Sequence, residues 1–574
     1  MLEINIKDSY LLITMPLRDF PETFNIDNTI KEVISYDMYN ETNCINDRFF
    51  SIEKAVEFIK NENKDVKQFL KNIKIWNLAN SSGEKFDCIK YSIEYCKIDC
   101  LILRKGYNTF NTWMMELVNI NINECLTIAS LAHRYFIESK CYDDVYQLSG
   151  IPQIFIQKCV VGGRTMVREN KKTIINNFIQ ALDARSLYPS AMYRLDGFLR
   201  GLPKVISNLN YDEVKNKDGY FIEVIIKSVG IKRKFPLLSF IDDNGVRQFT
   251  NDMIGKTVFI DKTTAEDIIK FQAVEFDVIR GYYFDEGFNT TIKDVIKNLY
   301  TERALKVKQE NKSEIVYKLI MNSGYGKSIM KEIAFNTKIF NDDDEFYTYL
   351  SRNYNYVESF NKIEGSNKII MKVIKPINNH FNIAHVGVSI LSMSKRIMNE
   401  VICLAEDNNI DIFYQDTDSM SIEYENIETL RTKFNEKYNR ELIGSNMHQF
   451  GYDLKLKYTD DKGKEQKAVN VVGIKGIYVG KKTYIVELKG NKKGTGEEVL
   501  GHYIRMKGIP NSCIKYTCKK LNLNPIQLYE KLYAGDKVDF DLTEEGNKSN
   551  FKFNKDFSIN TIKSGMYSRK LQFN

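Results

Sequence analysis

The chain has 574 residues, enough for several domains, and its 43% hydrophobic and 27% charged residues are ordinary for a globular protein. The net charge is only +7, but residues 451–574 hold 24 Lys and Arg against 14 Asp and Glu. This local excess of positive charge is typical of a surface that contacts a polyanion, and equally of a well-solvated surface. No apolar run approaches the roughly 18 residues of a membrane helix, and the N-terminal residues lack the basic-then-apolar pattern of a signal peptide, so we expect no membrane association.

Cysteine and histidine give no sign of a metal site. The ten cysteines are scattered without paired C-x-x-C motifs, and the five histidines do not cluster. We therefore expect free thiols in a reducing compartment and histidines with structural roles.

The N-terminal part of the chain mixes helical and strand-like stretches. Residues 80–84 (Asn-Ser-Ser-Gly-Glu) predict a loop, whereas residues 88–103 and Thr127 to Ser139 have helical spacing.

A strand followed by a helix is predicted around Asp183. The apolar residues 178–182 lead into Asp183, and Ser186 is a plausible N-cap for a helix that opens with Leu187, Tyr188 and Pro189. A carboxylate at a strand end beside the N–H groups of a helix start can hold a metal ion and a polyphosphate together, although Asp183 alone could equally be a structural cap.

Farther along, residues 220–226 (Tyr-Phe-Ile-Glu-Val-Ile-Ile) predict a strand, and two helices follow at 291–309 and 314–327. Arg303 and Lys306 lie at i and i+3 on the first helix, and Lys318, Asn322 and Tyr325 lie at i, i+4 and i+7 on the second. Such a stripe can bind a nucleoside triphosphate through cations for its phosphates and a ring for its sugar or base. In isolation it is also typical of a solvated amphipathic helix.

The most informative segment follows a long helix predicted from Phe381 to Ala405. Residues 411–414 and 420–422 predict two short strands, with Asp416, Thr417, Asp418 and Ser419 at the tip of the hairpin between them. Two carboxylates placed together repel each other, and a hard divalent cation such as Mg²⁺ removes that cost.

These segments together resemble motifs A, B and C of the family B DNA polymerases, in that family's order. The matching stretches are Asp183-x-x-Ser186-Leu187-Tyr188-Pro189, Lys318-x-x-x-Asn322-Ser323-x-Tyr325-Gly326 and Tyr414-x-Asp416-Thr417-Asp418-Ser419. The resemblance implies a mixed α/β (α+β) fold of the right-hand polymerase type, with palm, fingers and thumb.

Three shorter matches are similar to the protein-primed branch of that family, found in phages, virophage-like elements and linear plasmids. Lys482-Thr483-Tyr484 resembles its Lys-x-Tyr motif, Gly162-Gly163-Arg164 resembles its Tyr-x-Gly-Gly linker with Val160 in place of the tyrosine, and Tyr95-x-x-x-Asp99 resembles its third exonuclease motif.

The resemblance implies a division of the chain into seven parts. We expect, in order, an exonuclease-like remnant (1–150), a linker (151–180), palm with a first insertion of the type that contacts a terminal protein (181–290), fingers (291–335), a possible second insertion (336–380), palm (381–480), and thumb with a basic C-terminal region (481–574).

The resemblance also implies residue roles and ligands. Asp183 and Asp418 would bind two Mg²⁺ ions, with Mn²⁺ as a substitute, and Asp416 would support the hairpin or primer terminus. Residues expected to bind the nucleotide are Ser186, Leu187, Tyr188, Arg303, Lys306, Lys318, Asn322 and Tyr325, and those expected to contact primer or DNA are Lys482, Tyr484, Gly162, Gly163 and Arg164. Tyr188 would exclude a ribose 2′-hydroxyl.

The expected partners are a DNA template and primer, deoxynucleoside triphosphates and a terminal priming protein, with the polymerase itself a monomer. The expected location is intracellular: the host cytoplasm or, for a fungal linear plasmid, the mitochondrion.

Proofreading is expected to be absent from the chain as given. A family B exonuclease takes four carboxylates from three motifs, and only the third, with Tyr95 and Asp99, is visible here. The alternative is that the sequence is a fragment whose missing part restores the exonuclease site.

Two other functions remain open from the residues alone. One is a family B polymerase primed by nucleic acid, and the other is an inactive DNA-binding relative. A reverse transcriptase fits less well, because its hairpin has adjacent aspartates where this chain has Asp-Thr-Asp.

Overall fold

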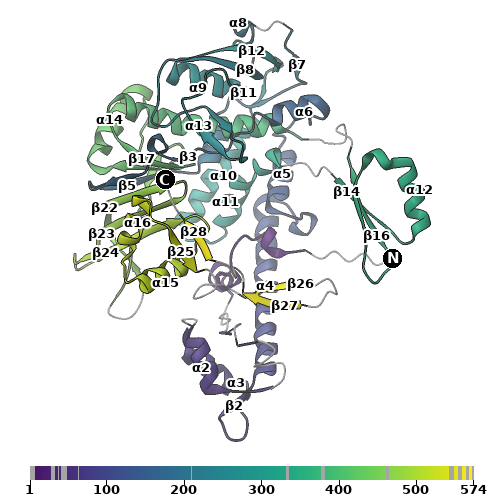
Figure 1. The fold of residues 1–574 in the computed structure, drawn as a ribbon, viewed down its shortest axis with the longest axis vertical. Helices are drawn as coiled ribbons and strands as arrows, with labels where there is room; N and C mark the ends of the chain where they lie inside the picture. The colour runs from purple at the N-terminus through teal and green to yellow at the C-terminus, as the bar shows by residue number, and fades with distance from the viewer. Residues whose placement is uncertain are drawn as a thin grey trace. The chain divides into compact units, whose positions relative to one another are not determined.

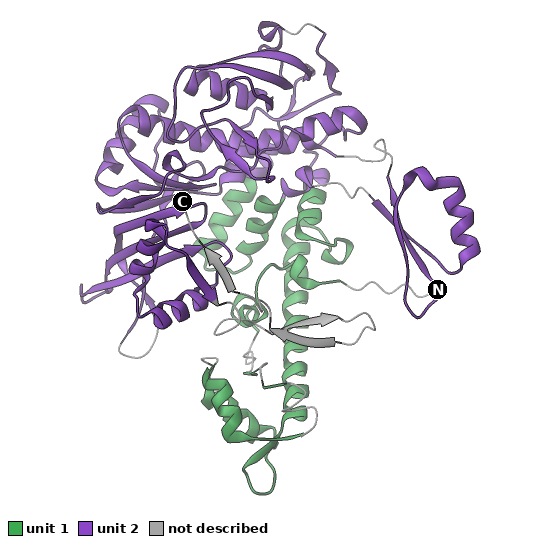
Figure 2. Cartoon of the chain, in the orientation of Figure 1, with its two compact units in different colours: residues 1–135, 298–323, 547–566 green, residues 136–297, 324–546, 567–574 purple. Residues whose placement is uncertain are grey.

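The computed structural model is a mixed helix and sheet protein that divides into two compact units (Figures 1 and 2). Unit 1 comprises residues 1–135, 298–323 and 547–566, and unit 2 comprises residues 136–297, 324–546 and 567–574. The structure describes residues 7–26, 33–35, 38–39, 48–61, 64–207, 210–330, 335–375, 382–460, 465–541, 549–553, 559–563 and 568–571.

Unit 1 is mostly helical. Its longest helix, α4 (Cys88–Val118), extends beyond the predicted 88–103, and it packs against α11 (Glu314–Ser323). The small helices α2 (Ile52–Asn61) and α3 (Val66–Ile75) form a separate apolar core with the start of α4, centred on Phe69, Phe86 and Tyr91. Tyr95 belongs to this core, so this tyrosine helps to hold α4 against the small helices.

Unit 2 is built on one large antiparallel sheet. Its strand order is β24-β23-β22-β5-β18-β17-β3, with β19 also pairing with β5 and β4 with β22. The bounds are β3 Thr165–Val167, β4 Thr173–Ile175, β5 Ile179–Ala184, β17 Ile412–Asp416, β18 Ser419–Glu423, β19 Phe450–Tyr452, β22 Val469–Gly480, β23 Thr483–Asn491 and β24 Glu498–Met506. The sheet thus brings together strands that are more than two hundred residues apart in the sequence.

The strands of a second sheet lie, in the sequence, between the strand that carries Asp183 and the helices at 291–323. Its order is β11-β8-β12-β7, with bounds β7 Lys204–Val205, β8 Gly219–Val229, β11 Thr257–Asp261 and β12 Val274–Phe284. Helix α9 (Lys262–Gln272) and the long helix α13 (Ala384–Asp407) pack against each other, and residues of both enter the apolar core of this sheet. Figure 1 shows α13 next to the four-stranded sheet, and α13 contacts β11.

The segment predicted as a second insertion has its own small core. Strands β14 (Phe335–Phe340), β15 (Val357–Lys362) and β16 (Ile369–Ile374) form a three-stranded sheet covered by α12 (Asp343–Asn353). Phe340, Phe346 and Met371 are buried between the sheet and the helix, which makes the segment a self-contained element within unit 2.

Helices α15 (Asn511–Leu521) and α16 (Pro525–Ala534) form an apolar core with residues of β22 and β23. The boundary predicted after residue 480 falls at the turn between β22 and β23, so the large sheet continues across it.

Several local predictions are confirmed. Residues 80–84 form a turn, α5 spans Ile128–Glu138, α10 spans Thr291–Lys308, and α13 and the β17–β18 hairpin lie where the sequence indicates them. The nine cysteines in the described part of the chain are free thiols.

One helix prediction is wrong. Helix α11 ends at Ser323 rather than Lys327, and Tyr325 precedes a short 3₁₀ turn at Gly326–Ile329. Gly324 lies at this break, and a Cβ there would come within 2.1 Å of the Phe136 ring, so a larger residue would collide with that ring. Tyr325 is therefore not on the helical face that carries Lys318 and Asn322.

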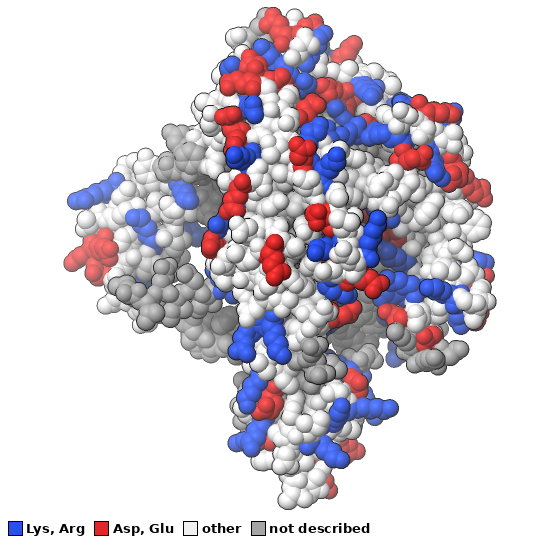
Figure 3. All heavy atoms as spheres, turned by 180° about the vertical axis from the view of Figure 1, so that it is seen from behind, with Lys and Arg blue, Asp and Glu red and all other residues white. Residues whose placement is uncertain are grey.

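Acidic and basic side chains are interspersed on the face shown in Figure 3. No helix among the described residues is long and apolar enough to cross a membrane.

Candidate active site

Asp183 and Asp418 lie at the same end of two neighbouring strands. Strand β5 pairs with β18 so that Asp183 is directly opposite Ser419, and the Ala184 N–H donates a 2.7 Å hydrogen bond to the Asp418 carbonyl oxygen. Asp418 lies in the turn of the β17–β18 hairpin, where Thr417 has a φ of 59°. This left-handed residue reverses the chain within two residues and keeps the tip of the hairpin beside β5.

Burial and mutual repulsion disfavour the charged form of these carboxyls. Burial, followed by the nearby charges of Asp418 and Asp453, raises the pKa of Asp183 from 3.8 to about 7. The pKa of Asp418 is also raised, first by burial and then by Asp416 and Asp453. The charged forms of both carboxyls are therefore disfavoured, and a bound cation would stabilise them.

Asp453 is a third carboxylate near the pair, and the sequence analysis missed it. Its N–H donates to the Ala181 carbonyl oxygen at 2.9 Å, just after β19 pairs with β5, and its carboxylate forms a 2.7 Å ion pair with Lys455. Only the pairing of β19 with β5 reveals its position, since no motif surrounds it. Within the described ranges, no three His, Cys, Asp or Glu side chains are close enough together to form a metal site by themselves.

Asp416 has a different environment from Asp183 and Asp418, because a lysine is paired with it. Lys482 Nζ lies 3.0 Å from both Asp416 carboxylate oxygens, and Thr165 Oγ1 donates to Oδ1 at 2.9 Å. The Lys482 N–H also donates to the Tyr414 hydroxyl at 2.9 Å. Lys482 and Asp416, far apart in the sequence, are thus joined at the hairpin, and half of the Lys482 side chain stays exposed.

Tyr484 lies below this pair in a cluster of tyrosines. Its ring centroid is 4.6 Å from that of Tyr414 and 5.5 Å from that of Tyr478, and its exposed fraction is only 9%. Tyr484 therefore packs against Tyr414 of β17 and Tyr478 of β22, where large rings fill the space between the strands.

The Gly162-Gly163-Arg164 segment also contacts the hairpin. A Cβ on Gly163 would lie 2.4 Å from Thr417 Cγ2, whereas one on Gly162 would meet nothing within 4 Å. The Arg164 carbonyl oxygen accepts a 2.9 Å hydrogen bond from the Thr417 N–H. The Arg164 side chain is 3% exposed, and its guanidinium donates to Gln415 Oε1 and to two main-chain carbonyl groups.

Tyr188 and Tyr325 form one wall of the site in unit 2. Their rings are stacked with centroids 4.0 Å apart and planes 25° apart. Tyr188 is on α7 (Leu187–Arg194), which begins after Ser186, and burial followed by a hydrogen bond with Tyr188 raises the pKa of Tyr325. Ser186 is in the N-cap position as predicted, but it has a left-handed φ of 51° and its side chain makes no capping hydrogen bond.

The remaining nucleotide-binding candidates belong to unit 1. Lys318 and Asn322 are exposed on α11, while Val316, Ile320 and Met321 are buried on its other face. On α10, Arg303 Nε donates to Glu314 at 2.7 Å, and Lys306 is partly exposed. The predicted stripe is therefore solvent-facing at Lys318 and Asn322, whereas the charge of Arg303 is already paired.

Comparison with known proteins identifies the family. The family described as "DNA polymerase type B, organellar and viral" matches residues 1–408, well over half of the chain. The chain belongs to this family. This confirms the resemblance seen in the sequence.

The relatives and solved structures agree with this assignment. The chain is 24% identical over 534 residues to a DNA polymerase of Kluyveromyces lactis, covering 89% of this chain and 48% of the relative. It is 22% identical over 582 residues to a probable DNA polymerase of Podospora anserina, covering 96% and 42%. The chain thus spans about half the length of these curated relatives, and the loss of the exonuclease stays a prediction.

The fold is similar to that of phi29 DNA polymerase. One crystal form gives a TM-score of 0.60 at 14% identity, covering 99% of this chain and 80% of that one. A ternary complex of the phi29 enzyme with primer-template DNA and incoming nucleotide substrates gives a TM-score of 0.58, also at 14% identity. The expected polymerase fold is thus confirmed.

Proposed function

We propose that this chain is a template-directed DNA polymerase that adds deoxynucleotides to a 3′ end. The observation that carries the proposal is the proximity of two carboxyls with raised pKa values: Asp183 on β5 and Asp418 in the turn of the hairpin that pairs with β5. Membership of the type B polymerase family supports the same reaction.

Divalent cations fit this carboxylate pair, because their charge would offset the burial and the neighbouring negative charges that raise both pKa values. Asp183 and Asp418 would hold two Mg²⁺ ions, with Mn²⁺ as a substitute, and Asp453 is close enough to add to their field. When bound, such ions lower the pKa of an attacking hydroxyl and neutralise a triphosphate. Pairing of β5 with the hairpin, including the hydrogen bond from the Ala184 N–H to the Asp418 carbonyl oxygen, places the two carboxylates side by side before the substrate binds.

Binding of the nucleotide is assigned to three groups of residues. The N–H groups that open α7, at Ser186, Leu187 and Tyr188, suit phosphate oxygens, and Tyr188 stacked on Tyr325 would pack against the sugar. Lys318 and Asn322 present exposed polar groups at i and i+4 for the triphosphate, with Lys306 as a further cation. Arg303 is a weaker candidate, since its guanidinium is paired with Glu314.

The primer end is assigned to the surface around Lys482. Its ammonium group is held by Asp416 and remains half exposed, so it can contact a phosphate while the carboxylate fixes its position. Tyr484, Gly163 and Arg164 would act by supporting the hairpin, as their contacts with Tyr414, Thr417 and Gln415 suggest. Gly162, which also belongs to the predicted linker motif, has open space beside it.

We further propose that replication is primed by a terminal protein on a linear viral or plasmid genome. The Lys-x-Tyr element beside the hairpin and the fold shared with phi29 DNA polymerase support this. Transfer of a labelled nucleotide to a priming protein, rather than to a nucleic-acid primer, distinguishes it from ordinary priming. Because template and triphosphates are found inside cells, an intracellular site of action follows from the proposal.

Primer extension by the purified chain tests the central proposal. Extension should require a template, deoxynucleotides and a divalent cation, and Asp183→Asn and Asp418→Asn should each abolish it. Asp252→Asn, which changes an exposed carboxylate of the same unit, is the matched control and should retain activity. Near-normal extension by either active-site variant would refute the assignment, and a wild-type chain that binds DNA without extending it would favour the inactive relative.

A further inference from the structure

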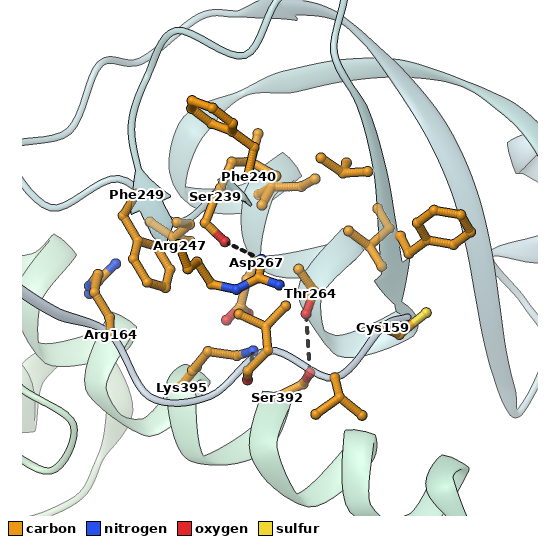
Figure 4. A pocket seen from close by; sticks show the side chains of 18 of the residues that line it. Cys159, Arg164, Ser239, Phe240, Arg247, Phe249, Thr264, Asp267, Ser392 and Lys395 are labelled. Carbon is orange, nitrogen blue, oxygen red and sulfur yellow. Dashed lines mark hydrogen bonds between the residues drawn. The ribbon is translucent and has the colours of Figure 1, made fainter. Parts of the chain in front are cut away.

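A cavity of about 530 Å³ lies within unit 2 (Figure 4), and Gln415 of β17 is among the residues that line it. Its walls are formed by β11, α9, α13, the segment 157–164 and the segment 237–249. The volume is within the range of small-molecule binding sites. Gln415 and Arg164 form part of the wall, whereas Asp183, Asp418 and Tyr188 do not line it.

The cavity is lined by cations that lack acidic partners. Lys395 Nζ donates a 2.8 Å hydrogen bond to the Val161 carbonyl oxygen, and Arg247 Nη1 donates a 3.0 Å hydrogen bond to Ser239 Oγ. In the part of the chain that the structure describes, neither side chain forms an ion pair with a carboxylate. Arg164 also lines the cavity and donates only to neutral oxygens, and Lys158, an exposed lysine, is a fourth cation of the lining.

Burial makes these charges costly. Burial, together with the neighbouring charges of Arg247 and Arg164, lowers the pKa of Lys395 to about 8, against the opposite effect of Asp261 and Asp267. Burial likewise lowers the pKa of Arg164 to about 10. Charged groups taken out of water without a counter-charge destabilise a fold, so a cluster of them is expected where a ligand supplies the missing charge.

The acidic groups nearby are already satisfied. Asp267 lines the cavity, but Arg396 Nε donates to it at 2.7 Å and Asn399 donates to its other oxygen at 3.0 Å. Asp261, which does not line the cavity, accepts hydrogen bonds from Thr264 and Ser392 at 2.6 and 2.7 Å, and its charge offsets only part of the effect of burial on Lys395. The residues that line the cavity therefore carry more positive than negative charge, with Asp267 as their one carboxylate in the described part of the chain.

The remaining walls are apolar and aromatic. Leu237, Leu238, Phe240, Phe249 and Ile268 line the cavity, and Figure 4 shows Phe240 and Phe249 on the same side of it as Arg247. A bound anion would thus be shielded from water on these sides, which strengthens its attraction to the two cations.

We propose that this cavity binds a compact phosphate-bearing anion between Arg247 and Lys395. The planar guanidinium of Arg247 matches two phosphate oxygens, and the ammonium of Lys395 adds a point charge. The hydroxyl of Ser239, which accepts from Arg247, keeps its own proton to donate to the same anion. The ligand is either free phosphate or a nucleoside monophosphate whose base lies against the aromatic wall.

Calorimetric titration of the whole chain tests the proposal. Inorganic phosphate and adenosine 5′-monophosphate are the two probes, each used in EDTA so that metal-dependent binding at the polymerase site does not contribute. Lys395→Met and Arg247→Met keep much of the side-chain volume and remove the charge, and each should weaken binding at least about tenfold, the loss of one good charged contact. Lys232→Met, at an exposed lysine of the same unit, is the control and should bind as wild type does.

Thermal unfolding gives an independent readout. Without ligand, Lys395→Met should unfold at a temperature equal to or above that of wild type, because an uncompensated buried charge has been removed. Phosphate should raise the unfolding temperature of wild type but not that of the variant. Binding of the monophosphate at least tenfold tighter than phosphate assigns a nucleotide, and similar binding assigns free phosphate.

Three results would overturn the proposal. They are no binding of either probe to wild type at millimolar concentration, binding that is unchanged in both charge variants, and lower unfolding temperatures for both variants without ligand, which would mean that the cations are structural. None of these results bears on primer extension, so the test is independent of the proposed polymerase activity.

Discussion

Replacing Asp183 with asparagine should stabilise the protein in the absence of divalent cations while abolishing its proposed activity. The side chain keeps its shape and can still hydrogen-bond, but it no longer carries a charge that is disfavoured by burial and by Asp418. In most proteins an aspartate at a strand end can be replaced with little effect or at some cost, so a gain in stability is a specific expectation.

The magnitude follows from the pKa of Asp183, which rises from 3.8 to about 7. One pKa unit corresponds to about 1.4 kcal/mol, so the penalty on the folded state has an upper limit of about 4 kcal/mol. The carboxyl is only partly buried and water screens some of the repulsion, so we expect a gain of about 1–3 kcal/mol for Asp183→Asn.

The pH dependence of this gain has a definite sign. Between pH 4 and pH 7 the folded protein keeps a proton on Asp183 that the unfolded chain has released, so the free energy of unfolding of wild type falls as the pH rises through this interval. The advantage of Asp183→Asn should therefore be small near pH 4, intermediate at pH 5 and complete above pH 7.

Unfolding of both proteins is measured in EDTA at pH 5 and pH 8, with Asp252→Asn as the control for loss of an exposed carboxylate. Asp418→Asn provides a second comparison, because removing its charge should lower the pKa of Asp183 and reduce the pH dependence. A variant less stable than wild type at pH 8, or equally stabilised at both pH values, would show that the raised pKa does not reflect the folded state.

Three further predictions concern substitutions at single positions. Tyr188→Ala should raise the use of ribonucleotides relative to deoxyribonucleotides about tenfold, measured as the ratio of kcat/KM values; an unchanged ratio would count against a role in sugar selection. Lys318→Ala should weaken nucleotide affinity about tenfold to a hundredfold, whereas Lys482→Ala should weaken primer binding and make it less sensitive to salt; identical defects in nucleotide affinity alone would contradict this division. Gly163→Ala should cost about 1–3 kcal/mol of stability and reduce primer extension because its Cβ would collide with the hairpin turn, whereas Gly162→Ala, with open space around it, should behave as wild type; equal effects of the two would contradict the packing argument.

Short-range features of the active site were predictable because they depend on local chemistry. The alternation of residue types around 411–423 and the polar tip at Asp416 and Asp418 specify a hairpin without reference to the rest of the chain. The apolar strand ending at Asp183 and the helix after Ser186 are local in the same sense. Their order along the chain was enough to indicate the family before any tertiary contact was known.

Local signals failed where the deciding contact was distant in the sequence. The spacing of Lys318, Asn322 and Tyr325 favoured one continuous helix, but α11 ends at Ser323, Gly324 packs closely on Phe136, and Tyr325 stacks on Tyr188. Periodicity does not report these contacts, because Phe136 and Tyr188 lie on other parts of the chain.

Only the tertiary structure decided which groups share the site and in what state of charge. Pairing of β19 with β5 brings Asp453 near Asp183, although 270 residues separate them and no motif marks the later aspartate. Contacts across the sheet likewise join Lys482 to Asp416. The sequence determined the catalytic residue types and their local setting. Burial and cross-strand neighbours, which set the pKa values of Asp183 and Lys395, exist only once the sheets have formed.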